Sequence, residues 1–206
     1  MAAYSTAADG DMRLAGPRRA FLRRTVGLRD TVVPRQIHGV RVADARERDL
    51  ADADGVVSGN ARLALGVYGA DCPGVIIAAP DRLAVGHCGW RGTAGGMVAQ
   101  LVDAVAAKSQ HPVASWCAFI GPGISGPRYE VDGPVLGARA WPPRAVLPSR
   151  EGHAFLDLAA ALAHDLSVAG IRRVQHAGVC TAQDPRLHSY RHQGSGLVQL
   201  LVAWRT

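Results

Sequence analysis

Residues 61–90, ARLALGVYGADCPGVIIAAPDRLAVGHCGW, contain three apolar runs separated by turn residues. Its apolar and β-branched runs predict one strand before Asp71, a second strand after Gly74 and a third strand that ends near His87. Each strand boundary presents a chemically reactive side chain, Cys72 at the first and His87 at the last. The stretch therefore predicts consecutive strands of a sheet with metal-binding or nucleophilic groups at their ends.

The rest of the chain alternates predicted helices and strands. Helices are predicted at PRRAFLRRTVGL (17–28), at TAGGMVAQLVDAVAAKSQ (93–110), where Gly95 and Gly96 loosen the first turn, and at HAFLDLAAALAHDLSVAG (153–170). Strands are predicted within residues 31–44, 52–59, 115–131, 173–180 and 197–204, and residues 134–150 are predicted to be an exposed, proline-rich connection. This alternation favours a mixed α/β or α+β layered domain.

The composition argues against a nucleic-acid-binding protein and against a membrane protein. The 206 residues carry a formal net charge of +6, and 48% of them are hydrophobic, as in a globular protein with a substantial core. Aromatic residues make up 5%, too few for base stacking along a strand, so we expect no nucleic-acid partner. No apolar run approaches the ~20 residues that span a bilayer, and the N-terminus lacks a signal-like apolar core, so we expect a cytoplasmic protein.

Three separated side chains offer metal-binding chemistry: His38 in QIHG, Cys72 in ADCPG and His87 in GHCGWRG. Their wide spacing matches no closed structural zinc pattern, in which ligands come in tight pairs. It suits a catalytic site built from three strand ends, which would leave one position on zinc open for water. The same residues also allow Cys72 to act as a nucleophile with His87 as its base, and the spacing does not decide between the two hypotheses.

A series of motifs resembles the laccase-domain family, whose bacterial members have been called polyphenol oxidases and, later, purine nucleoside phosphorylases. The motifs are QIHG, DADGVVS, ADCPGV, GHCGWRG, IGPGISGPRYEV, GVCT and HSYRHQGSG, in the family's order and spacing from about residue 36 to the end. The resemblance implies an α+β fold, a layered α/β/β/α sandwich of mixed sheets with flanking helices. It also implies a single domain over residues 1–206, with a divergent N-terminal segment at 1–35.

The resemblance also implies roles for individual residues. His38, Cys72 and His87 match the family's zinc ligands, and Asp71 matches a carboxylate beside the metal that transfers protons. Arg91, which we expect at the start of the long helix, would bind an anion. The expected substrate or phosphate contacts are Arg91, Tyr129, Ser189, Tyr190 and Arg191, while Tyr129 and its neighbour Glu130 could equally pack and cap a strand end.

The last loop departs from the family pattern. His192 and Leu197 stand where the family usually has arginines, so positive charge is lost there. Near the metal motifs, Pro73 follows Cys72 directly, one position earlier than usual, and Cys88 replaces an alanine. Cys88 is expected to be buried because adjacent strand residues point to opposite faces.

The resemblance favours a zinc-dependent purine nucleoside enzyme that phosphorolyses adenosine or inosine, or that deaminates adenosine. Its partners would be the nucleoside and phosphate, with no nucleic acid and no membrane, and we expect a monomer. A Cys–His amidase or hydrolase acting on peptidoglycan precursors is the alternative enzyme, and a degenerate, non-catalytic member is the alternative without activity. Copper oxidation is disfavoured, because the eight histidines form no His-x-His pairs.

Overall fold

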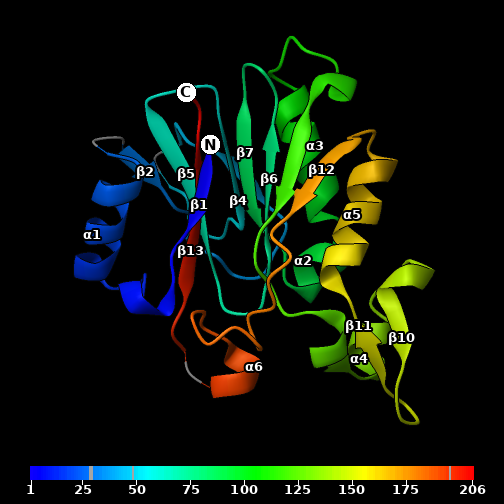
Figure 1. Ribbon diagram of the computed structural model, residues 1–206. Coiled ribbons are helices and arrows are strands. Elements are labelled where there is room, and N and C mark those ends of the chain that lie inside the picture. The colour runs from blue at the N-terminus through cyan, green and yellow to red at the C-terminus, as the bar shows by residue number, and fades with distance from the viewer. Residues whose placement is uncertain (28–29, 48, 195) are drawn as a thin grey trace.

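The computed structural model describes residues 1–27, 30–47, 49–194 and 196–206. Figure 1 shows four layers: helix α1 (Ala15–Thr25), a four-stranded sheet, a six-stranded sheet, and the helices α3 (Met97–Ala106) and α5 (Leu158–Val168). This is the α/β/β/α sandwich that the sequence led us to expect. Among the described residues, no helix combines the length and apolar character needed to cross a bilayer.

The six-stranded sheet has the strand order β12-β8-β6-β7-β4-β3. Its strands are β3 (Val42–Asp44), β4 (Gly55–Ser58), β6 (Gly74–Ala78), β7 (Leu83–His87), β8 (Cys117–Ile120) and β12 (Arg173–His176). Strands β6 and β7 pair antiparallel with Gly74 opposite His87. This register brings the turn that contains Cys72 beside the end of β7.

The four-stranded sheet has the order β1-β13-β5-β2. It contains β1 (Ala2–Tyr4), β2 (Asp30–Val32), β5 (Leu63–Gly69) and β13 (Gln199–Trp204). Both chain ends therefore contribute neighbouring strands, and β13 pairs antiparallel with β1 on one side and β5 on the other. The first strand was not predicted, whereas β5, β6 and β7 lie where residues 61–90 predicted them.

The core is divided by the six-stranded sheet, and alternate residues of one strand face opposite sides. In β6, Val75 and Ile77 pack toward α3 and α5, while Ile76 packs toward the four-stranded sheet. Because both faces are covered, this strand is apolar at successive positions and not only at every second one. Burying each such side chain stabilises the fold by about 1.5–3 kcal/mol. A third cluster lies under α1, where Phe21 and Met12 are buried.

The predicted helix at 93–110 is broken in the structure. A short helix α2 (Trp90–Ala94) comes first, and α3 begins only after Gly96, whose φ of 87° lies in the left-handed region. Glycine reaches this conformation without steric cost, which is why the chain can turn here. Arg91 therefore lies in the five-residue helix α2, and its expected place at the start of a long helix was wrong.

The predicted connection at 134–150 contains regular structure. Helix α4 (Gly133–Leu136) is followed by β10 (Val146–Pro148), which pairs with β11 (Ala154–Leu156), and β11 pairs with β9 (Glu130–Val131). The start of the helix predicted at 153–170 is thus a strand. The helix proper, α5, begins after Asp157, whose carboxylate accepts a hydrogen bond from the Ala160 N–H as an N-cap.

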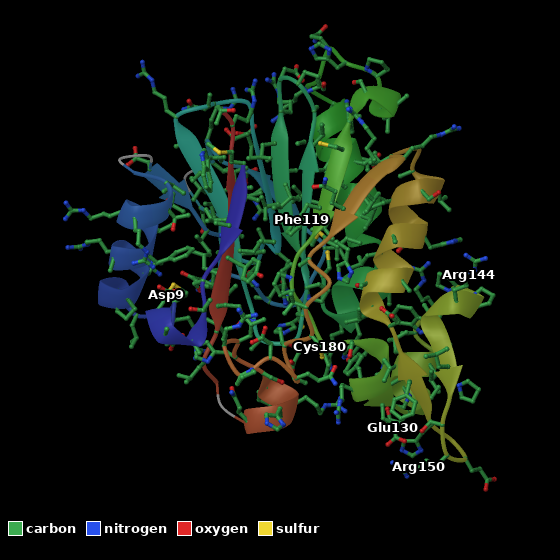
Figure 2. All side chains as sticks on the ribbon, viewed as in Figure 1. Asp9, Phe119, Glu130, Arg144, Arg150 and Cys180 are labelled. Atoms are coloured by element: carbon green, nitrogen blue, oxygen red, sulfur yellow. The ribbon has the colours of Figure 1, made fainter. Side chains whose placement is uncertain are left out.

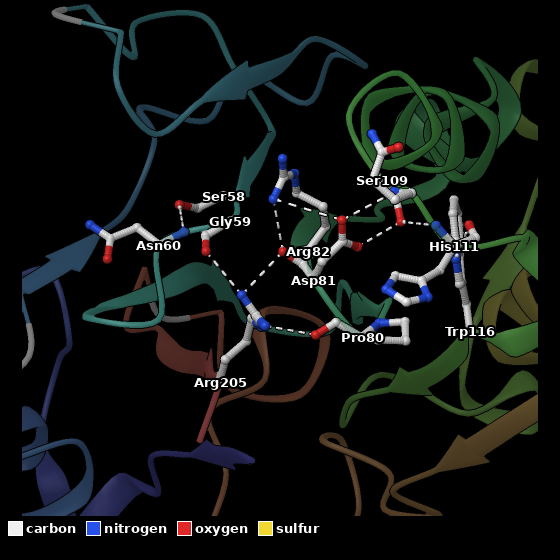
Figure 3. A network of polar contacts seen from close by, with 11 residues as sticks. Ser58, Gly59, Asn60, Pro80, Asp81, Arg82, Ser109, His111, Trp116 and Arg205 are labelled. Atoms are coloured by element: carbon white, nitrogen blue, oxygen red, sulfur yellow. Dashed lines mark hydrogen bonds and ion pairs between the residues drawn. The ribbon is translucent and has the colours of Figure 1, made fainter.

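Short elements complete the chain. They are α6 (Tyr190–Gln193) and the 3-10 turns at Ala7–Asp9, Val113–Ser115, Gly126–Arg128 and Pro143–Ala145. The end of β13 is fastened by Arg205, whose guanidinium donates to the backbone carbonyls of Gly59, Pro80 and Asp81 (Figure 3). The side chain of Asp81 in turn accepts from the Ser109 hydroxyl. The Arg205 bonds connect the end of β13 in the four-stranded sheet to loops of the six-stranded sheet, at the end of the strands away from His87.

Candidate functional site

Three side chains from separate parts of the fold converge at one point. The candidate ligand atoms of His38, Cys72 and His87 all lie within 4.8 Å of one another. His38 lies in the loop between β2 and β3, Cys72 in the turn between β5 and β6, and His87 at the end of β7. The two imidazole rings meet edge to face with their centroids 4.9 Å apart. His87 is buried and His38 is exposed, so the group runs from the protein interior to its surface.

A buried carboxylate holds the His38 loop in place. Asp54, which has no exposed surface, accepts hydrogen bonds from the backbone N–H groups of Ile37, His38 and Gly39 at 2.8–2.9 Å. His38 has a φ of 65°, a conformation that costs a non-glycine residue free energy and persists only where its surroundings impose it. The three bonds to Asp54 supply that constraint. Asp54 lies in the quoted motif DADGVVS, and no role was predicted for it from the sequence.

The same carboxylate orients His87. Asp54 Oδ1 lies 2.8 Å from His87 Nδ1, and a hydrogen bond there makes Nε2 the nitrogen that would coordinate a metal after losing its proton. Burial lowers the pKa of His87, but the hydrogen bonds to Asp54 and Cys72 outweigh it and raise that pKa to about 9. Burial and the nearby positive charges of His87 and Arg91 lower the pKa of His38, which favours its neutral, metal-binding form.

A glycine allows the three groups to approach. A Cβ atom at Gly89 would lie 2.8 Å from the sulfur of Cys72 and 3.7 Å from a carbon of the His38 ring. The first distance is shorter than van der Waals contact permits, so any side chain at this position would displace the thiol. Gly89 is therefore required by the close packing of Cys72 and not by its backbone angles, which are ordinary.

Asp71 joins the Cys72 turn to the C-terminal loop. Its two carboxylate oxygens accept hydrogen bonds from the Thr181 hydroxyl and from the Arg191 backbone N–H, both at 2.6 Å. Asp71 has a φ of 84°, and these bonds hold it in that unfavourable conformation. Thr181, in the quoted motif GVCT, is almost fully buried and had been given no role.

A cavity of about 760 Å³ opens over the cluster, a size typical of small-molecule sites. Its described lining includes the three convergent residues, Asp71, four aromatic side chains and four arginines: Tyr68, Trp90, Tyr129, Tyr190, Arg13, Arg35, Arg91 and Arg191. Two of the arginines lie over aromatic rings, Arg91 over Trp90 at 4.3 Å and Arg191 over Tyr129 at 4.9 Å. Burial raises the pKa of Tyr129 to about 12, so its hydroxyl stays protonated and can donate a hydrogen bond.

Two residues singled out by sequence have other contacts. Ser189 is fully buried and caps α6, its hydroxyl accepting from the His192 N–H. The Glu130 carboxylate pairs with Arg150 at 3.1 Å beside the sheet formed by β10, β11 and β9, and both residues are labelled in Figure 2. The same carboxylate also accepts from Ser149. Neither residue belongs to the described lining of the cavity.

The remaining cysteines are free thiols. Cys88 is fully buried, as expected, and burial raises its pKa. Cys180, labelled in Figure 2, accepts hydrogen bonds from the backbone N–H and the hydroxyl of Ser125. Cys72 is thus the cysteine that meets the two histidines.

The donor set fits a transition-metal ion. Two imidazoles and one thiolate, with no fourth His, Cys, Asp or Glu in the cluster among the described residues, correspond to a zinc site with one open position. Blue-copper centres share the His₂Cys set but add a weak axial ligand, usually methionine. No methionine belongs to the described lining of the cavity, so the described residues offer the His₂Cys set without that axial ligand.

Comparison with known proteins places the chain in a family. A family model described as multi-copper polyphenol oxidoreductase laccase matches residues 6–204. The chain belongs to this laccase-domain family. Its relatives within the family include a Deinococcus radiodurans protein named purine nucleoside phosphorylase, 31% identical over 88% of this chain and 73% of its own length. A Mycobacterium tuberculosis protein with the same name is 32% identical over 84% of this chain and 72% of its own length.

Solved structures of two bacterial proteins share the fold. A Neisseria meningitidis protein superposes with a TM-score of 0.82 at 28% identity, covering 92% of this chain and 81% of its own. YlmD from Geobacillus stearothermophilus superposes with a TM-score of 0.81 at 26% identity, covering 92% and 79%. The sandwich is therefore the fold of the laccase-domain family, and the sequence resemblance to that family is confirmed.

Proposed function

We propose that this protein is a zinc-dependent enzyme acting on purine nucleosides, with phosphorolysis of adenosine or inosine as its main reaction. The observation that carries the proposal is the open His₂Cys group at the floor of a cavity lined by aromatic rings and arginines. Relatives named purine nucleoside phosphorylase, about 30% identical over most of the chain, supply the substrate class.

Each part of the cavity suits one part of such a substrate. The exposed ring of Tyr190 offers a face for a purine base, and the planar guanidinium of Arg91 offers a bidentate fork for phosphate. Since α2 is only five residues long, the anion would be bound by this side chain and not by a helix terminus. Tyr190 and Arg191 would close the cavity on the side of the C-terminal loop.

In phosphorolysis, a phosphate oxygen attacks C1′ of the ribose and the bond from C1′ to the purine nitrogen breaks. The bond's electron pair stays on the base, which takes up one proton and leaves as the free purine. Asp71 is the one carboxylate in the described lining, and we assign it the proton transfer. Zinc held by His38, Cys72 and His87 would act as a Lewis acid toward substrate oxygens and would activate a water molecule.

Adenosine deamination is a second reaction for the same cavity, favoured by Asp71 lying next to the metal-binding group. Water adds at C6 of adenine, the bond to the exocyclic nitrogen breaks, and ammonia leaves with a proton carried by Asp71. The deaminases that use zinc combine a metal-activated water with a carboxylate in this way. Inosine and ammonia would be the products.

Product analysis tests the proposal. Zinc-loaded protein is incubated with adenosine or inosine, with and without phosphate, and the products are separated by chromatography. We expect adenine or hypoxanthine together with ribose 1-phosphate, only when phosphate is present, and no turnover by a Cys72→Ala variant. Inosine formed from adenosine without phosphate would show deamination. If metal-loaded protein yields no free base and no inosine, the proposal fails, and tight zinc binding without turnover would favour a non-catalytic member.

One observation favours an alternative enzyme. His87 connects the Asp54 carboxylate to the Cys72 thiol, the order of groups found in cysteine hydrolases. A Cys–His amidase acting on peptidoglycan precursors would use these residues without a metal. Amidase turnover by chelator-treated protein, lost in Cys72→Ala, would favour this function, whereas activity that returns only with added zinc would exclude it.

A further inference from the structure

The cavity receives one arginine from the N-terminal segment. Arg13 belongs to the described lining, far along the chain from the metal-binding residues, and precedes helix α1. We propose that Arg13 binds a phosphate group in the cavity. The inference rests on the proposed function only in taking phosphate as the ligand, either free phosphate or the 5′-phosphate of a nucleotide.

The backbone around Arg13 is held firmly against the C-terminal segment. Met12, its neighbour, is fully buried beneath α1 and donates its N–H to the Val198 carbonyl at 3.1 Å. The Val198 N–H donates to the Asp11 carboxylate at 3.3 Å. Bonds in both directions therefore fix residues 11–13 relative to Val198, which itself lines the cavity.

The guanidinium of Arg13 lies over Gly196. A Cβ atom at Gly196 would be 3.4 Å from an Arg13 terminal nitrogen, an ordinary contact distance, so the charged group lies directly against this part of the cavity wall. The next residue, Leu197, is apolar and also lines the cavity. Residues 196–198 carry no charged side chain. Arg13 therefore supplies the positive charge on this side of the cavity.

Among the cavity arginines, Arg13 has a weakly held side chain. Its guanidinium pairs with Asp11 through Nε and one terminal nitrogen, each 3.4 Å from a carboxylate oxygen, and its side chain is 52% exposed. Both distances are long for a charge-assisted hydrogen bond, so this pair contributes little stability and the guanidinium can exchange it for a phosphate. Arg191, by contrast, donates to the Glu130 carbonyl at 2.9 Å and lies over Tyr129. A planar guanidinium with several N–H donors matches phosphate bidentately.

Direct binding measurements test the inference without turnover. Zinc-loaded protein is titrated calorimetrically with inorganic phosphate, with adenosine and with adenosine 5′-monophosphate. We expect Arg13→Gln to weaken binding of inorganic phosphate, or of the monophosphate relative to adenosine, by about five- to tenfold. Weaker binding of inorganic phosphate would indicate a site for free phosphate. Weaker binding of the monophosphate relative to adenosine would indicate a site for the 5′-phosphate of a nucleotide. Arg19→Gln, an exposed arginine of α1 outside the cavity lining, removes the same charge elsewhere and is expected to bind like the wild type.

A double variant separates charge from structure. Leu197→Arg in the Arg13→Gln background returns a cation to the same wall and is expected to recover most of the lost affinity. The inference is overturned if Arg13→Gln binds both phosphate ligands as tightly as Arg19→Gln, or if the double variant stays as weak as Arg13→Gln. Binding is measured directly and does not depend on turnover. If phosphate binding depends on Arg13 but the protein releases no purine base, the proposed function fails and the inference about Arg13 stands.

Discussion

The Asp54 carboxylate accepts a hydrogen bond from Nδ1 of His87 at 2.8 Å while the same group binds three consecutive backbone N–H groups around His38. One fully buried side chain therefore positions two of the three convergent residues. The cross-strand register makes this possible, since Gly55 in β4 pairs with Gly86 in β7. Asp54 and His87, each one residue beyond those partners, meet at the end of the sheet.

Replacing Asp54 by Asn tests this positioning. An amide can accept fewer of the four hydrogen bonds and turns an N–H₂ group toward backbone donors, so we expect zinc affinity to fall by about 10–100-fold. Thermodynamic stability should fall by about 3 kcal/mol. Zinc affinity is measured by competition with a chromogenic chelator and stability by urea unfolding. Asp52→Asn, which alters an exposed carboxylate two residues away, is the matched control, and equal zinc affinity in the two variants would refute the role of Asp54.

Gly89→Ala tests the packing around Cys72. The added methyl carbon would lie 2.8 Å from the Cys72 sulfur, so the thiol must shift and the three donors can no longer reach one ion. We expect at least a tenfold loss of zinc affinity with the far-ultraviolet circular dichroism spectrum unchanged. The control is Gly16→Ala in α1, where nothing lies within 4 Å of the new carbon and alanine favours the helix by about 0.5–1 kcal/mol. Undiminished zinc binding by Gly89→Ala would rule out this requirement.

Thr181→Val tests the support of Asp71. The substitution keeps the shape of the buried side chain but removes the hydroxyl that donates to Asp71 at 2.6 Å. We expect kcat to fall about tenfold, because the proposed proton-transfer group loses one of its two anchors, while KM for phosphate stays within about twofold. Thr181→Ser, which keeps the hydroxyl, should recover kcat. A Thr181→Val enzyme with wild-type kcat would count against a role for Asp71 in proton transfer.

Asp44 makes stability sensitive to acid. Hydrogen bonds from the side chain and backbone of Arg46, and the hydrogen bond and charge attraction of Lys108, hold the pKa of Asp44 well below its ordinary value of 3.8. A carboxylate with a lowered folded-state pKa stabilises the fold above its unfolded pKa and loses that contribution as the pH falls toward the folded value. Asp44→Asn should therefore lower the free energy of unfolding by about 1–2 kcal/mol at pH 7.

The difference between Asp44→Asn and the wild type should shrink progressively as the pH falls below 3.8. Urea unfolding at a series of pH values measures it. The exposed Asp103→Asn substitution on α3 is the control and should change stability little at any of these pH values. An Asp44→Asn deficit that is constant from pH 7 into the acid range would contradict the ion-pair explanation.

The local sequence predicted the strands around the site but not the hydrogen bonds from Asp54 that position His38 and His87. Alternating apolar runs and turn residues were enough for β5, β6 and β7, because each of these elements is short and locally encoded. The role of Asp54 depends on which strand lies beside β7 and in what register, and that pairing is not encoded locally. The convergence of His38 with Cys72 and His87 was expected from the family resemblance, since spacing alone left a nucleophilic Cys–His pair equally open.

Two predicted elements differ from the structure, one because of strand pairing and the other because of a backbone angle. Residues 146–148 and 154–156 form strands because they pair with one another, and residues 154–156 also pair with β9. These nonlocal contacts override the helical pattern at Ala154–Leu156. The break at Gly96 separates α2 from α3 although the sequence on both sides favours helix. In each case tertiary contacts or a backbone angle decided the structure, and neither can be derived from propensity.

The most direct test of the metal site is the X-ray absorption spectrum of the zinc-loaded protein, with metal content measured in parallel. We predict one zinc per chain with one sulfur at about 2.3 Å, two imidazole nitrogens at about 2.0 Å and one light atom from solvent, and loss of the sulfur shell in Cys72→Ala. A coordination shell without sulfur, or one closed by a fourth protein ligand, would contradict an open site formed by His38, Cys72 and His87.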